Sequence, residues 1–559
     1  MRTTSFRHIS YLVDFLVSNG IEDVIISPGS RNAPLIIAFD AHPNIKTHLI
    51  HDERVAAFYA LGMADASDKP VAVTCTSGTA LLNYAPAVAE AYYREVPLLV
   101  LSADRPEELI DQGDGQTIRQ TEVYRNFIVS SHTYSSLNDN GELEKALSNL
   151  INLPKGPVHI NLPFEEPLYG IEERGVEKLA QQALKETPKL NGLKNLNQLE
   201  TIWKNSEKKM IIVGQHNPDP KWSNVLQLIS NDPSVSILVE NTSNVQNFTR
   251  ICHNIDRTLA GIKEDELEKF QPDLLISIGG AVVSKRIKAL LRNYKAKNTW
   301  RVGNHLIEED TYQSAAHMIH IEPTDLLQHL VDIDQTPNSN FGSLWKQRDF
   351  LSQEAHERYM STIPFSDLKV FQQIFDLIPD NANLHMANSS VVRYCQLFNP
   401  ISGIEYYSNR GVSGIDGSSS TAAGFSLKVR DKLNVLISGD ISFFYDSNAF
   451  WNNELGDNLK VIVISNGGGG IFEFIAGPPS TDQAHVFFAE TNAIVQGICQ
   501  AFDLNYLVAE NEIELNDSLQ TLFYSSENSR PTILEIKTQQ CENARILTSY
   551  FEYIAEQNA

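Results

Sequence analysis

The sequence contains no apolar run long enough to cross a bilayer, which takes roughly 20 residues as a helix. Its N-terminal stretch, MRTTSFRHISYLVDFLVSNG, has a basic start and several apolar residues, but Asp14 interrupts it. No small-residue cleavage site follows, and the spacing is that of an amphipathic helix. We therefore expect neither an integral membrane segment nor a signal peptide.

Cysteine is also scarce, with five residues in 559: Cys75, Cys252, Cys395, Cys499 and Cys541. They are scattered, odd in number and include no CxxC pair. This pattern argues against a disulfide framework or a structural zinc site. It favours a reducing compartment, and we expect a cytoplasmic protein.

Positive charge is in deficit, because 45 lysines and arginines face 69 acids and the net charge is −24. Such a chain is poorly suited to nucleic acid or an anionic membrane surface as its main partner. Any cluster of arginines near glycine turns is then a local exception. In an acidic protein it indicates a site that holds an anion.

Length and composition predict a multidomain globular protein, since 559 residues exceed what one core usually supports and 42% are hydrophobic. Short apolar runs alternate with helical patterns, which favours α/β architecture with parallel sheets. We expect three domains, at residues 1–182, 198–335 and 360–559, separated by a Lys- and Asn-rich linker and a charged stretch near 335–365. The predicted strands are DVIIS, VAVTC, PLLVLSA, PVHINLP, MIIVG, VSILVE, DLLISIG, MIHIEP, NLHMA, IEYYSN, NVLIS, KVIVIS and PTILEIK.

Two of these strands end on oxygen-bearing side chains. NVLIS runs into Gly439-Asp440, and KVIVIS runs into Asn466-Gly467-Gly468. Ligands collect at the carboxyl ends of parallel strands, and carboxylate and amide oxygens beside glycine backbone suit Mg²⁺ carrying a phosphate-bearing molecule. The alternative is an ordinary strand end with an Asp N-cap and a glycine turn.

Polar side chains at other strand ends are further candidates. Glu53 lies at a strand-to-helix corner, where it is either catalytic or a first-turn acid stabilised by the helix dipole. Ser30 and Arg31 follow a Pro-Gly turn and form either an anion hook or a solvated loop. Other candidates at strand ends and in the loops that follow them are Thr76, Ser77, Gly78, Thr79, Arg105, Gln116 and Arg119.

The third block contains the richest loop, YSNRGVSGIDGSSSTAAGFSL, with Arg410 at its entrance. Its glycines allow close backbone approach to a ligand, and the helix that follows could bind phosphate at its N-terminus, although flexible linkers look similar. Asn388 and Ser389 stand at a strand end with Arg393 one turn on. Lys285 in the middle block is either a ligand or a solvated helix residue.

Together these motifs resemble the thiamine-diphosphate-dependent enzymes, whose cofactor motif is Gly-Asp, then about 25–30 residues, then Asn-Asn. Here it reads Gly439-Asp440 and Ser465-Asn466. Within that superfamily the chain is similar to the 2-succinyl-5-enolpyruvyl-6-hydroxy-3-cyclohexene-1-carboxylate synthase family of menaquinone and phylloquinone biosynthesis. The similar segments are SPGSRNAPL, DERVAAFYALGMA, TSGTALLNYAPAVAEA, ADRPEELID, GQTIRQ, HINLPFEEPLY, NSSVVR, SNRGVSGIDG and STAAG.

The resemblance implies three doubly wound parallel-sheet domains, which bind the pyrimidine, form the centre and bind the diphosphate. It also implies a homodimer or homotetramer with active sites shared between subunits. In that arrangement the first block of one chain faces the third block of another. Residues as distant in sequence as Glu53 and Asp440 could then serve one cofactor.

The resemblance also implies cofactor roles. Asp440, Asn466 and the Gly468 carbonyl would hold Mg²⁺ (or Mn²⁺), and Glu53 would hydrogen-bond the pyrimidine ring of thiamine diphosphate. Ile415 would support the bent form of the cofactor. The remaining residues expected to contact the cofactor are Thr76, Asn388, Ser389, Gly439, Ile441, Ser442, Ile471 and Phe472.

The implied activity is that of a transferase: decarboxylation of 2-oxoglutarate and conjugate addition of the succinyl unit to isochorismate. Both substrates are dianions, which matches a cluster of cations in an acidic chain. The residues implied around the substrates and the reaction are Glu53, Ser30, Arg31, Gln116, Lys285, Arg393, Arg410, Asn388, Ser389, Ile471 and Phe472, with Arg105 and Arg119 in the same basic cluster.

Three positions depart from the superfamily or family pattern: Ile441 replaces a glycine, Ser465 replaces the first Asn, and Gly115 stands where some relatives have Asn. Two other functions remain open. One is a different thiamine-diphosphate decarboxylase or carboligase. The other is a non-catalytic descendant that binds a ligand, although such proteins usually lose the activating acid, which this chain keeps at Glu53.

Overall fold

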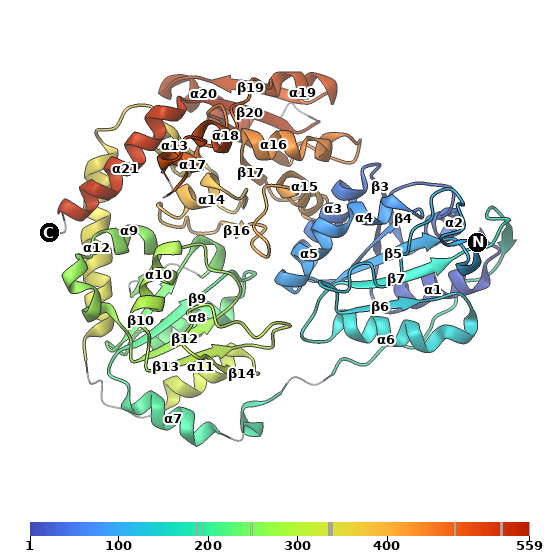
Figure 1. Cartoon of the computed structure of the whole chain (residues 1–559), viewed down its shortest axis with the longest axis horizontal. Coiled ribbons are helices and arrows are strands. Elements are labelled where there is room, and N and C mark those ends of the chain that lie inside the picture. The colour runs from blue at the N-terminus through green and yellow to red at the C-terminus, as the bar shows by residue number, and fades with distance from the viewer. Residues whose placement is uncertain are drawn as a thin grey trace. The chain divides into compact units, whose positions relative to one another are not determined.

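The computed structural model describes residues 1–185, 188–193, 195–245, 248, 250–333, 339–474, 477–525 and 529–557. It forms two compact units. Unit 1 contains Met1–Glu186, Gly411–Asp431 and Tyr445–Leu459, and unit 2 contains Thr187–Arg410, Lys432–Phe444 and Lys460–Ala559. Three six-stranded sheets, whose described pairings are all parallel, alternate with helices along the chain (Figure 1). The predicted α/β class with parallel sheets is confirmed.

The sheet of unit 1 has the order β3-β2-β4-β5-β7-β6. Apolar residues of α1, α2 and α6 pack with alternate strand residues in one core, because neighbouring side chains of a strand point to opposite faces. The strands are β2 (Asp23–Ile26), β3 (Lys46–Leu49), β4 (Val71–Cys75), β5 (Leu98–Asp104), β6 (Ser130–Thr133) and β7 (Val158–Pro163). The helices are α1 (Arg7–Ser18), α2 (Ala33–Ala41), α3 (Glu53–Ser67), α4 (Thr79–Asn83), α5 (Ala85–Arg94), α6 (Asn140–Ile151) and α15 (Ser418–Lys428), with short turns η1 (Glu107–Leu109), η2 (Leu137–Asp139) and η6 (Ser447–Phe450).

Helices α3 and α15 pack at very short range. A Cβ at Gly62 would lie 2.0 Å from the Thr421 carbonyl oxygen, and one at Gly424 would lie 2.2 Å from the Tyr59 carbonyl oxygen. Only glycine allows this approach. The small residues of STAAG therefore serve helix packing, and phosphate binding at the N-terminus of α15 stays a prediction.

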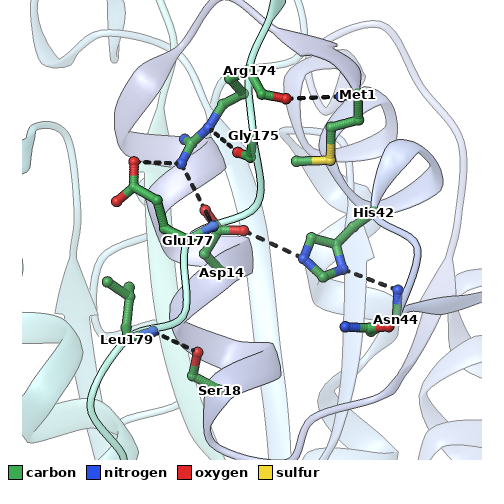
Figure 2. A network of polar contacts seen from close by, with 9 residues as sticks. All are labelled: Met1, Asp14, Ser18, His42, Asn44, Arg174, Gly175, Glu177 and Leu179. Carbon is green, nitrogen blue, oxygen red and sulfur yellow. Dashed lines mark hydrogen bonds and ion pairs between the residues drawn. The ribbon is translucent and has the colours of Figure 1, made fainter.

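A second, two-stranded sheet pairs β1 (Arg2–Thr4) with β8 (Ile171–Glu173), and the chain beyond it runs along α1. Figure 2 shows the buried carboxylate that holds this segment: Asp14 accepts from Arg174 Nη2 at 2.7 Å and from the Glu177 amide at 3.2 Å, and lies 3.3 Å from His42. The Leu179 amide donates to Ser18 Oγ at 3.0 Å. Burial raises the pKa of Asp14 and lowers that of His42. The amides of Gln182 and Lys185 also donate, to Asn19 Oδ1 at 2.7 Å and to Asn152 Oδ1 at 2.6 Å, so the start of the predicted linker is docked on unit 1.

The first sheet of unit 2 has the order β11-β10-β9-β12-β13-β14 and buries both faces. Its strands are β9 (Lys209–Val213), β10 (Val235–Val239), β11 (Ile251–Cys252), β12 (Leu274–Ile278), β13 (Asn298–Val302) and β14 (His317–Ile319). Around it lie α7 (Leu196–Asn205), α8 (Pro220–Ile229), α9 (Ile255–Ala260), α10 (Lys285–Asn293), α11 (Pro323–Asp332) and α12 (Phe341–Met360), with η3 (Leu190–Gly192), η4 (Asn241–Ser243) and η5 (Glu264–Phe270).

The second sheet of unit 2 has the order β16-β15-β17-β18-β20-β19. Its strands are β15 (Asn383–Met386), β16 (Glu405–Tyr407), β17 (Asn434–Gly439), β18 (Leu459–Ser465), β19 (Asn505–Ala509) and β20 (Thr532–Lys537). The helices are α13 (Asp367–Leu377), α14 (Ser390–Cys395), α16 (Asp440–Tyr445), α17 (Ile471–Phe474), α18 (Ala484–Phe488), α19 (Val495–Ala501), α20 (Glu512–Tyr524) and α21 (Gln540–Gln557), with η7 (Pro478–Ser480).

The predicted linkers fall only partly within the described residues, because 186–187, 194 and 334–338 lie outside them. The domain limits at 182, 198, 335 and 360 therefore stay predictions. Among the helices that the structure describes, none combines the length and apolar character needed to cross a membrane.

Candidate functional site

In unit 1, the loops after β2, β4 and β5 bring polar groups to one edge of the sheet. The Arg31 amide donates to Thr76 Oγ1 at 3.3 Å. The Arg31 guanidinium, 8% exposed as a residue, donates to the Phe164 carbonyl at 3.0 Å and to Glu166 at 3.3 Å. Burial is the largest cause of the lowered pKa of Arg31, and the positive charge of the nearby Arg105 is the next. Two arginines therefore face one region, which suits a bound anion.

Arg105 and Gln116 join this edge. Arg105 Nη1 lies 3.5 Å from Ser77 Oγ, and Arg105 Nε pairs with Asp114 at 2.7 Å. A Cβ at Gly78 would lie 3.2 Å from the Gln116 backbone. Gln116 itself has φ +56°, a conformation that is uncommon for residues other than glycine and clusters at functional sites. The loop after β5 thus folds onto the end of β4.

We expected Arg119 to belong to the same basic cluster as Arg31 and Arg105, but the structure places its side chain elsewhere. Its side chain is 83% exposed and pairs with Asp111 at 2.7 Å. In its place, the loop sends Gln120 inward, where Oε1 accepts from the Gly78 amide at 2.8 Å and Nε2 donates to Asn161 at 2.9 Å. Arg119 therefore lies apart from the buried arginine cluster, and a glutamine that sequence reasoning missed holds the turn at Gly78.

Glu53 is the first residue of α3, and the helix begins there because the preceding side chain caps it. Asp52 Oδ1 accepts from the Val55 amide at 3.2 Å. Burial is the largest cause of the raised pKa values of Cys75 and Tyr84, and the negative charge of Glu53 raises both pKa values further. The Glu53 carboxyl group therefore lies near the end of β4, beside the edge that carries Thr76.

Both neighbours of Glu53 are held by the segment Tyr445–Asn448 of the same unit. Asn448 Nδ2 donates to Asp52 Oδ2 at 2.8 Å, and Arg54 Nη2 donates to the Tyr445 carbonyl at 2.7 Å. Arg54 also lies 3.9 Å from Asp446. Burial raises the pKa of Asp446 to about 7, and the charge of Arg54 acts against this. The start of α3 is thus fixed on both sides of the predicted catalytic acid.

Ile415 lies in the glycine-rich loop of unit 1, and the residue is 36% exposed. The start of this loop is fixed by a buried carboxylate that the sequence did not reveal. Glu90 accepts from the amides of Gly411 at 2.8 Å and Val412 at 2.7 Å. Burial raises the pKa of Glu90 despite these bonds. The loop leaves Ile415 accessible for a ligand contact.

In unit 2, the ends of the adjacent strands β17 and β18 carry the predicted metal ligands. Asp440 is 2% exposed, and its carboxylate accepts from the Ile441 amide at 2.7 Å and from the Gly467 amide at 2.9 Å. Burial raises the pKa of Asp440 to about 6, and the nearby charge of Asp367 adds to this. A buried carboxylate with a raised pKa next to a second acid is suited to binding a cation.

Asn466 is oriented by Asp367, the first residue of α13. Asn466 Nδ2 donates to Asp367 Oδ2 at 2.9 Å, and Thr538 Oγ1 donates to Asp367 Oδ1 at 2.6 Å. A carboxylate only accepts, so the amide nitrogen must face Asp367 and the amide oxygen must point away from it. Gly468, with φ +152°, has a carbonyl that accepts from the Gly470 amide at 2.9 Å.

The residues of unit 2 that are predicted to contact the substrates form a second cluster. Arg410 Nη1 donates to Asn388 Oδ1 at 2.7 Å, and Asn388 Nδ2 donates to the Asn409 carbonyl at 2.7 Å. Ser389 has φ +73° at the start of α14, which carries the half-buried Arg393. Lys285 is the exposed first residue of α10. Burial is the largest cause of the lowered pKa of Lys288, and the positive charges of Arg410 and Arg393 lower it further. Lys288, Arg393 and Arg410 therefore lie in one region.

The remaining predicted residues lie at the second sheet of unit 2, apart from Ser30 in unit 1. Gly439 is the last residue of β17, and Asp440 is the first residue of α16. On that helix Ile441 is half-buried and Ser442 is buried. Ile471 and Phe472 are half-buried on α17, and the Phe472 ring lies 5.9 Å from that of Phe487. Ser30 is exposed in the loop before α2.

The donors in unit 2 fit a hard divalent cation with a bound diphosphate. One carboxylate, one amide oxygen and one carbonyl are oxygen donors of the kind that Mg²⁺ uses, leaving positions for phosphate oxygens and water. In the described parts of the chain, no group of three or more His, Cys, Asp or Glu residues could hold a metal. A site with a single acidic ligand is compatible with that finding, since such a set contains only one residue of those types.

Comparisons with known proteins identify the family. Residues 7–123 match the model of the N-terminal TPP-binding domain of thiamine pyrophosphate enzymes. A thiamin diphosphate-dependent enzyme from Mycobacterium smegmatis has a similar fold, with a TM-score of 0.73 at 16% identity, covering 96% of this chain and 100% of that one.

Curated relatives named 2-succinyl-5-enolpyruvyl-6-hydroxy-3-cyclohexene-1-carboxylate synthase cover nearly the whole chain. The protein of Flavobacterium johnsoniae is 41% identical over 97% of this chain and 98% of its own length. That of Christiangramia forsetii is 40% identical over the same shares, and that of Porphyromonas gingivalis is 38% identical over 98% and 97%. The chain therefore belongs to the 2-succinyl-5-enolpyruvyl-6-hydroxy-3-cyclohexene-1-carboxylate synthase family of thiamine pyrophosphate enzymes.

Proposed function

We propose that the protein decarboxylates 2-oxoglutarate and adds the succinyl unit to isochorismate, releasing CO₂ and 2-succinyl-5-enolpyruvyl-6-hydroxy-3-cyclohexene-1-carboxylate, a step of menaquinone biosynthesis. The observation that carries this proposal is the pair of Asp440 and Asn466 at adjacent strand ends, oriented by Gly467 and Asp367. The choice of substrates is supported by the 41% identity to a synthase over 97% of this chain.

Thiamine diphosphate would be held at its diphosphate end through Mg²⁺ (or Mn²⁺) bound by Asp440, Asn466 and the Gly468 carbonyl. Bound in this way, the cofactor supplies the electron sink that lets a 2-oxo acid lose CO₂ and react as a nucleophile. The cation would offset repulsion between the diphosphate and a chain of net charge −24. Gly439, Ser389 and Ser442 would complete the seat of the diphosphate.

Glu53 would hydrogen-bond the pyrimidine ring nitrogen, with one proton shared between the carboxyl group and the ring. The first turn of a helix stabilises negative charge, and the bonds of Asp52 and Arg54 to the segment Tyr445–Asn448 hold that turn in place. A fixed carboxylate has a lower cost of reorganisation when the proton moves. Thr76 and Ile415 would contact the same cofactor.

The cations would bind the substrate carboxylates. Arg31 and Gln116 lie at the edge of the unit 1 sheet, and Lys285, Arg393 and Arg410 belong to unit 2, with Ile471 and Phe472 as apolar neighbours. Guanidinium groups suit carboxylates because two N–H donors match two oxygens.

We further propose a homodimer or homotetramer in which Glu53 of one subunit and Asp440 of another serve one cofactor. The three sheet-containing blocks would then act as pyrimidine-binding, central and diphosphate-binding domains. Cys75, Cys252, Cys395 and Cys499 are free thiols, and we propose a reducing, cytoplasmic setting for the protein.

The test is direct. The purified protein is incubated with thiamine diphosphate, Mg²⁺, 2-oxoglutarate and isochorismate, while isochorismate absorbance is followed and the product is identified by mass. We expect consumption that needs all four components and one CO₂ per isochorismate. Turnover of 2-oxoglutarate with simple aldehydes, and none with isochorismate, would contradict the proposal and indicate another carboligase.

A further inference from the structure

A run of buried polar residues follows β10 in unit 2. Glu240 is 3% exposed, and Asn241, Thr242 and Ser243, which form η4, are at most 2% exposed. Burying four consecutive polar side chains is costly unless each finds partners. The partners of Glu240, Asn241 and Asn244 lie on three other segments, and each of those segments leads to a basic residue of the proposed substrate site.

Glu240 holds the segment that leads to Lys285. Its carboxylate accepts from the Val283 amide at 2.6 Å and from the Ser284 amide at 2.7 Å. Ser284 in turn caps α10, accepting from the Ile287 amide at 3.1 Å, and Lys285 is the first residue of that helix. Hydrogen bonds to an ionised carboxylate are among the stronger ones, so Glu240 sets where α10 begins.

Asn241 holds the helix that carries Arg393. Its backbone amide donates to Gln396 Oε1 at 2.8 Å, and its side chain donates to the Cys395 carbonyl at 2.8 Å. Both partners lie at the end of α14, two and three residues after Arg393. Asn254 adds a third contact there, to the Gln396 carbonyl at 3.0 Å. The position of α14 is thus set by this segment and not only by its own sheet.

Asn244 holds the strand that leads to Arg410. Its side chain accepts from the Tyr406 amide at 2.7 Å and donates to the Tyr406 carbonyl at 2.9 Å. Tyr406 belongs to β16, and Arg410 follows that strand after two intervening residues. Gln215 supports the same stretch by donating to the Ser408 carbonyl at 2.6 Å.

The charge of Glu240 also matters to the cluster. Burial raises the pKa of Glu240 to about 7, while its two amide bonds and the charge of Arg410 oppose the shift. Burial lowers the pKa of Lys288, and the charges of Arg410 and Arg393 lower it further. The negative charge of Glu240 opposes this shift. An acid within reach of several cations offsets part of their mutual repulsion.

We propose that the segment Glu240–Asn244 is a positioning element that arranges Lys285, Arg393 and Arg410 as one binding site for dicarboxylate substrates. The inference rests on the proposed function, which supplies the dicarboxylates. Its residues contact the backbone of the segments that carry the cations, so they are positioning residues and not catalytic ones. Their loss displaces the cations and leaves the metal ligands Asp440 and Asn466 in place.

The main variant is Glu240→Gln, which keeps the side-chain shape but turns an N–H donor toward an amide that it formerly accepted from. We expect KM for 2-oxoglutarate or isochorismate to rise at least about tenfold, with thiamine diphosphate and Mg²⁺ affinities within about twofold of the parent. The matched control is Asp273→Asn. Asp273 lies just before β12, whereas the amides that Glu240 binds follow that strand. Asp273 likewise accepts two backbone amides, from Glu207 at 3.2 Å and Lys208 at 3.0 Å. Its KM values should stay within about twofold.

A double-mutant cycle separates positioning from a general loss of structure. If Glu240 acts through Lys285, Glu240→Gln should raise KM by less than about twofold in a Lys285→Ala background. An equal rise in both backgrounds, or a Glu240→Gln enzyme that matches Asp273→Asn, would overturn the proposal. If Glu240→Gln fails to fold by circular dichroism, Asn241→Ala is tested against Arg393→Ala in the same cycle.

A second readout keeps this inference separate from the proposed function. Binding of glutarate, a plain dicarboxylate, is measured by calorimetry without turnover. Weaker glutarate binding in Glu240→Gln but not in Asp273→Asn supports the positioning element even if isochorismate is not consumed. Equal glutarate binding in all three proteins contradicts it even if the parent enzyme is active.

Discussion

The side-chain amide of Asn466 donates to Asp367 across 2.9 Å, and this contact decides which end of the amide faces the proposed metal site. Asp367 is 2% exposed, and burial raises the pKa of its carboxyl group. Groups of this kind orient metal ligands without touching the metal. The sequence motif points to Asn466, but the acid that orients it lies 99 residues earlier in the chain.

Asp367→Asn should weaken Mg²⁺ binding by about 10-fold or more, because an amide at position 367 can turn its own N–H₂ toward Asn466. The Mg²⁺ concentration that gives half-maximal thiamine diphosphate binding is the measurement. Asp349→Asn is the control, since Asp349 is a buried acid of the same unit that accepts from Thr258 at 3.0 Å. An unchanged Mg²⁺ requirement in Asp367→Asn would exclude an orienting role.

Metal binding should depend on pH through Asp440. Because burial raises the pKa of its carboxyl group to about 6, a proton competes with the cation below that pH, and above it the carboxylate is available. Mg²⁺ should therefore bind about tenfold more weakly at pH 5 than at pH 7. Titrations at several pH values, with circular dichroism to verify folding, measure this dependence. A flat profile between pH 5 and pH 7 would contradict the assignment of Asp440.

Arg393→Ala and Arg410→Ala should each raise the KM of at least one substrate by about tenfold or more, since each would remove the charge-assisted bond to a substrate carboxylate that we propose. Thiamine diphosphate affinity should change by less than about twofold. Arg119→Ala is the control, because that side chain is 83% exposed and paired with Asp111. Steady-state kinetics and cofactor titration give the comparison, and equal constants for all three variants would remove these arginines from the substrate site.

Gly62→Ala should lower the thermal midpoint, because the added Cβ would meet the Thr421 carbonyl at 2.0 Å and push α3 and α15 apart. Overpacking of this kind costs about 1–3 kcal/mol of unfolding free energy. Gly141→Ala, in α6 with nothing within 4 Å of the added Cβ, is the control and should not destabilise the protein. Equal midpoints for the two variants would mean that the helix pair tolerates separation.

Much of the fold could be predicted from sequence because its central strands are apolar runs bounded by turn residues. All thirteen named runs contain strands in the structure. β13, with Arg301 and Thr299, and β6, with the sequence SSHT, were not predicted. Polar residues interrupt the apolar pattern in both, so hydrophobic periodicity gives little signal for them. β1, β8, β11 and β19 were not predicted either.

The location of a candidate residue was predictable where it follows a strand end, as for Asp440 and Arg31. It was not predictable where burial decides the role. Glu90, Glu240 and Asp367 are buried acids whose partners are backbone amides or distant side chains, and composition does not distinguish them from surface acids. For the same reason Arg119 could not be separated from the buried arginines until its exposure was known.

Glu53→Gln should bind thiamine diphosphate nearly as well as the parent while its turnover falls by about 10²-fold or more, because the amide cannot share the ring proton. Cofactor titration and initial rates of isochorismate loss give the two quantities. Glu53→Asp is a useful companion variant, since it keeps the charge but shortens the reach. Near-normal rates in Glu53→Gln would remove this acid from the reaction.

Complementation between two inactive chains tests most directly whether Glu53 and Asp440 of different subunits serve one cofactor. Glu53→Gln and Asp440→Ala chains with different tags are co-expressed, and the doubly tagged assembly is purified and assayed. We predict no appreciable turnover from either variant alone and roughly half of the parent rate from a mixed dimer, because one of its two sites is intact. A mixed assembly that binds cofactor yet stays as inactive as its parents would contradict the shared site.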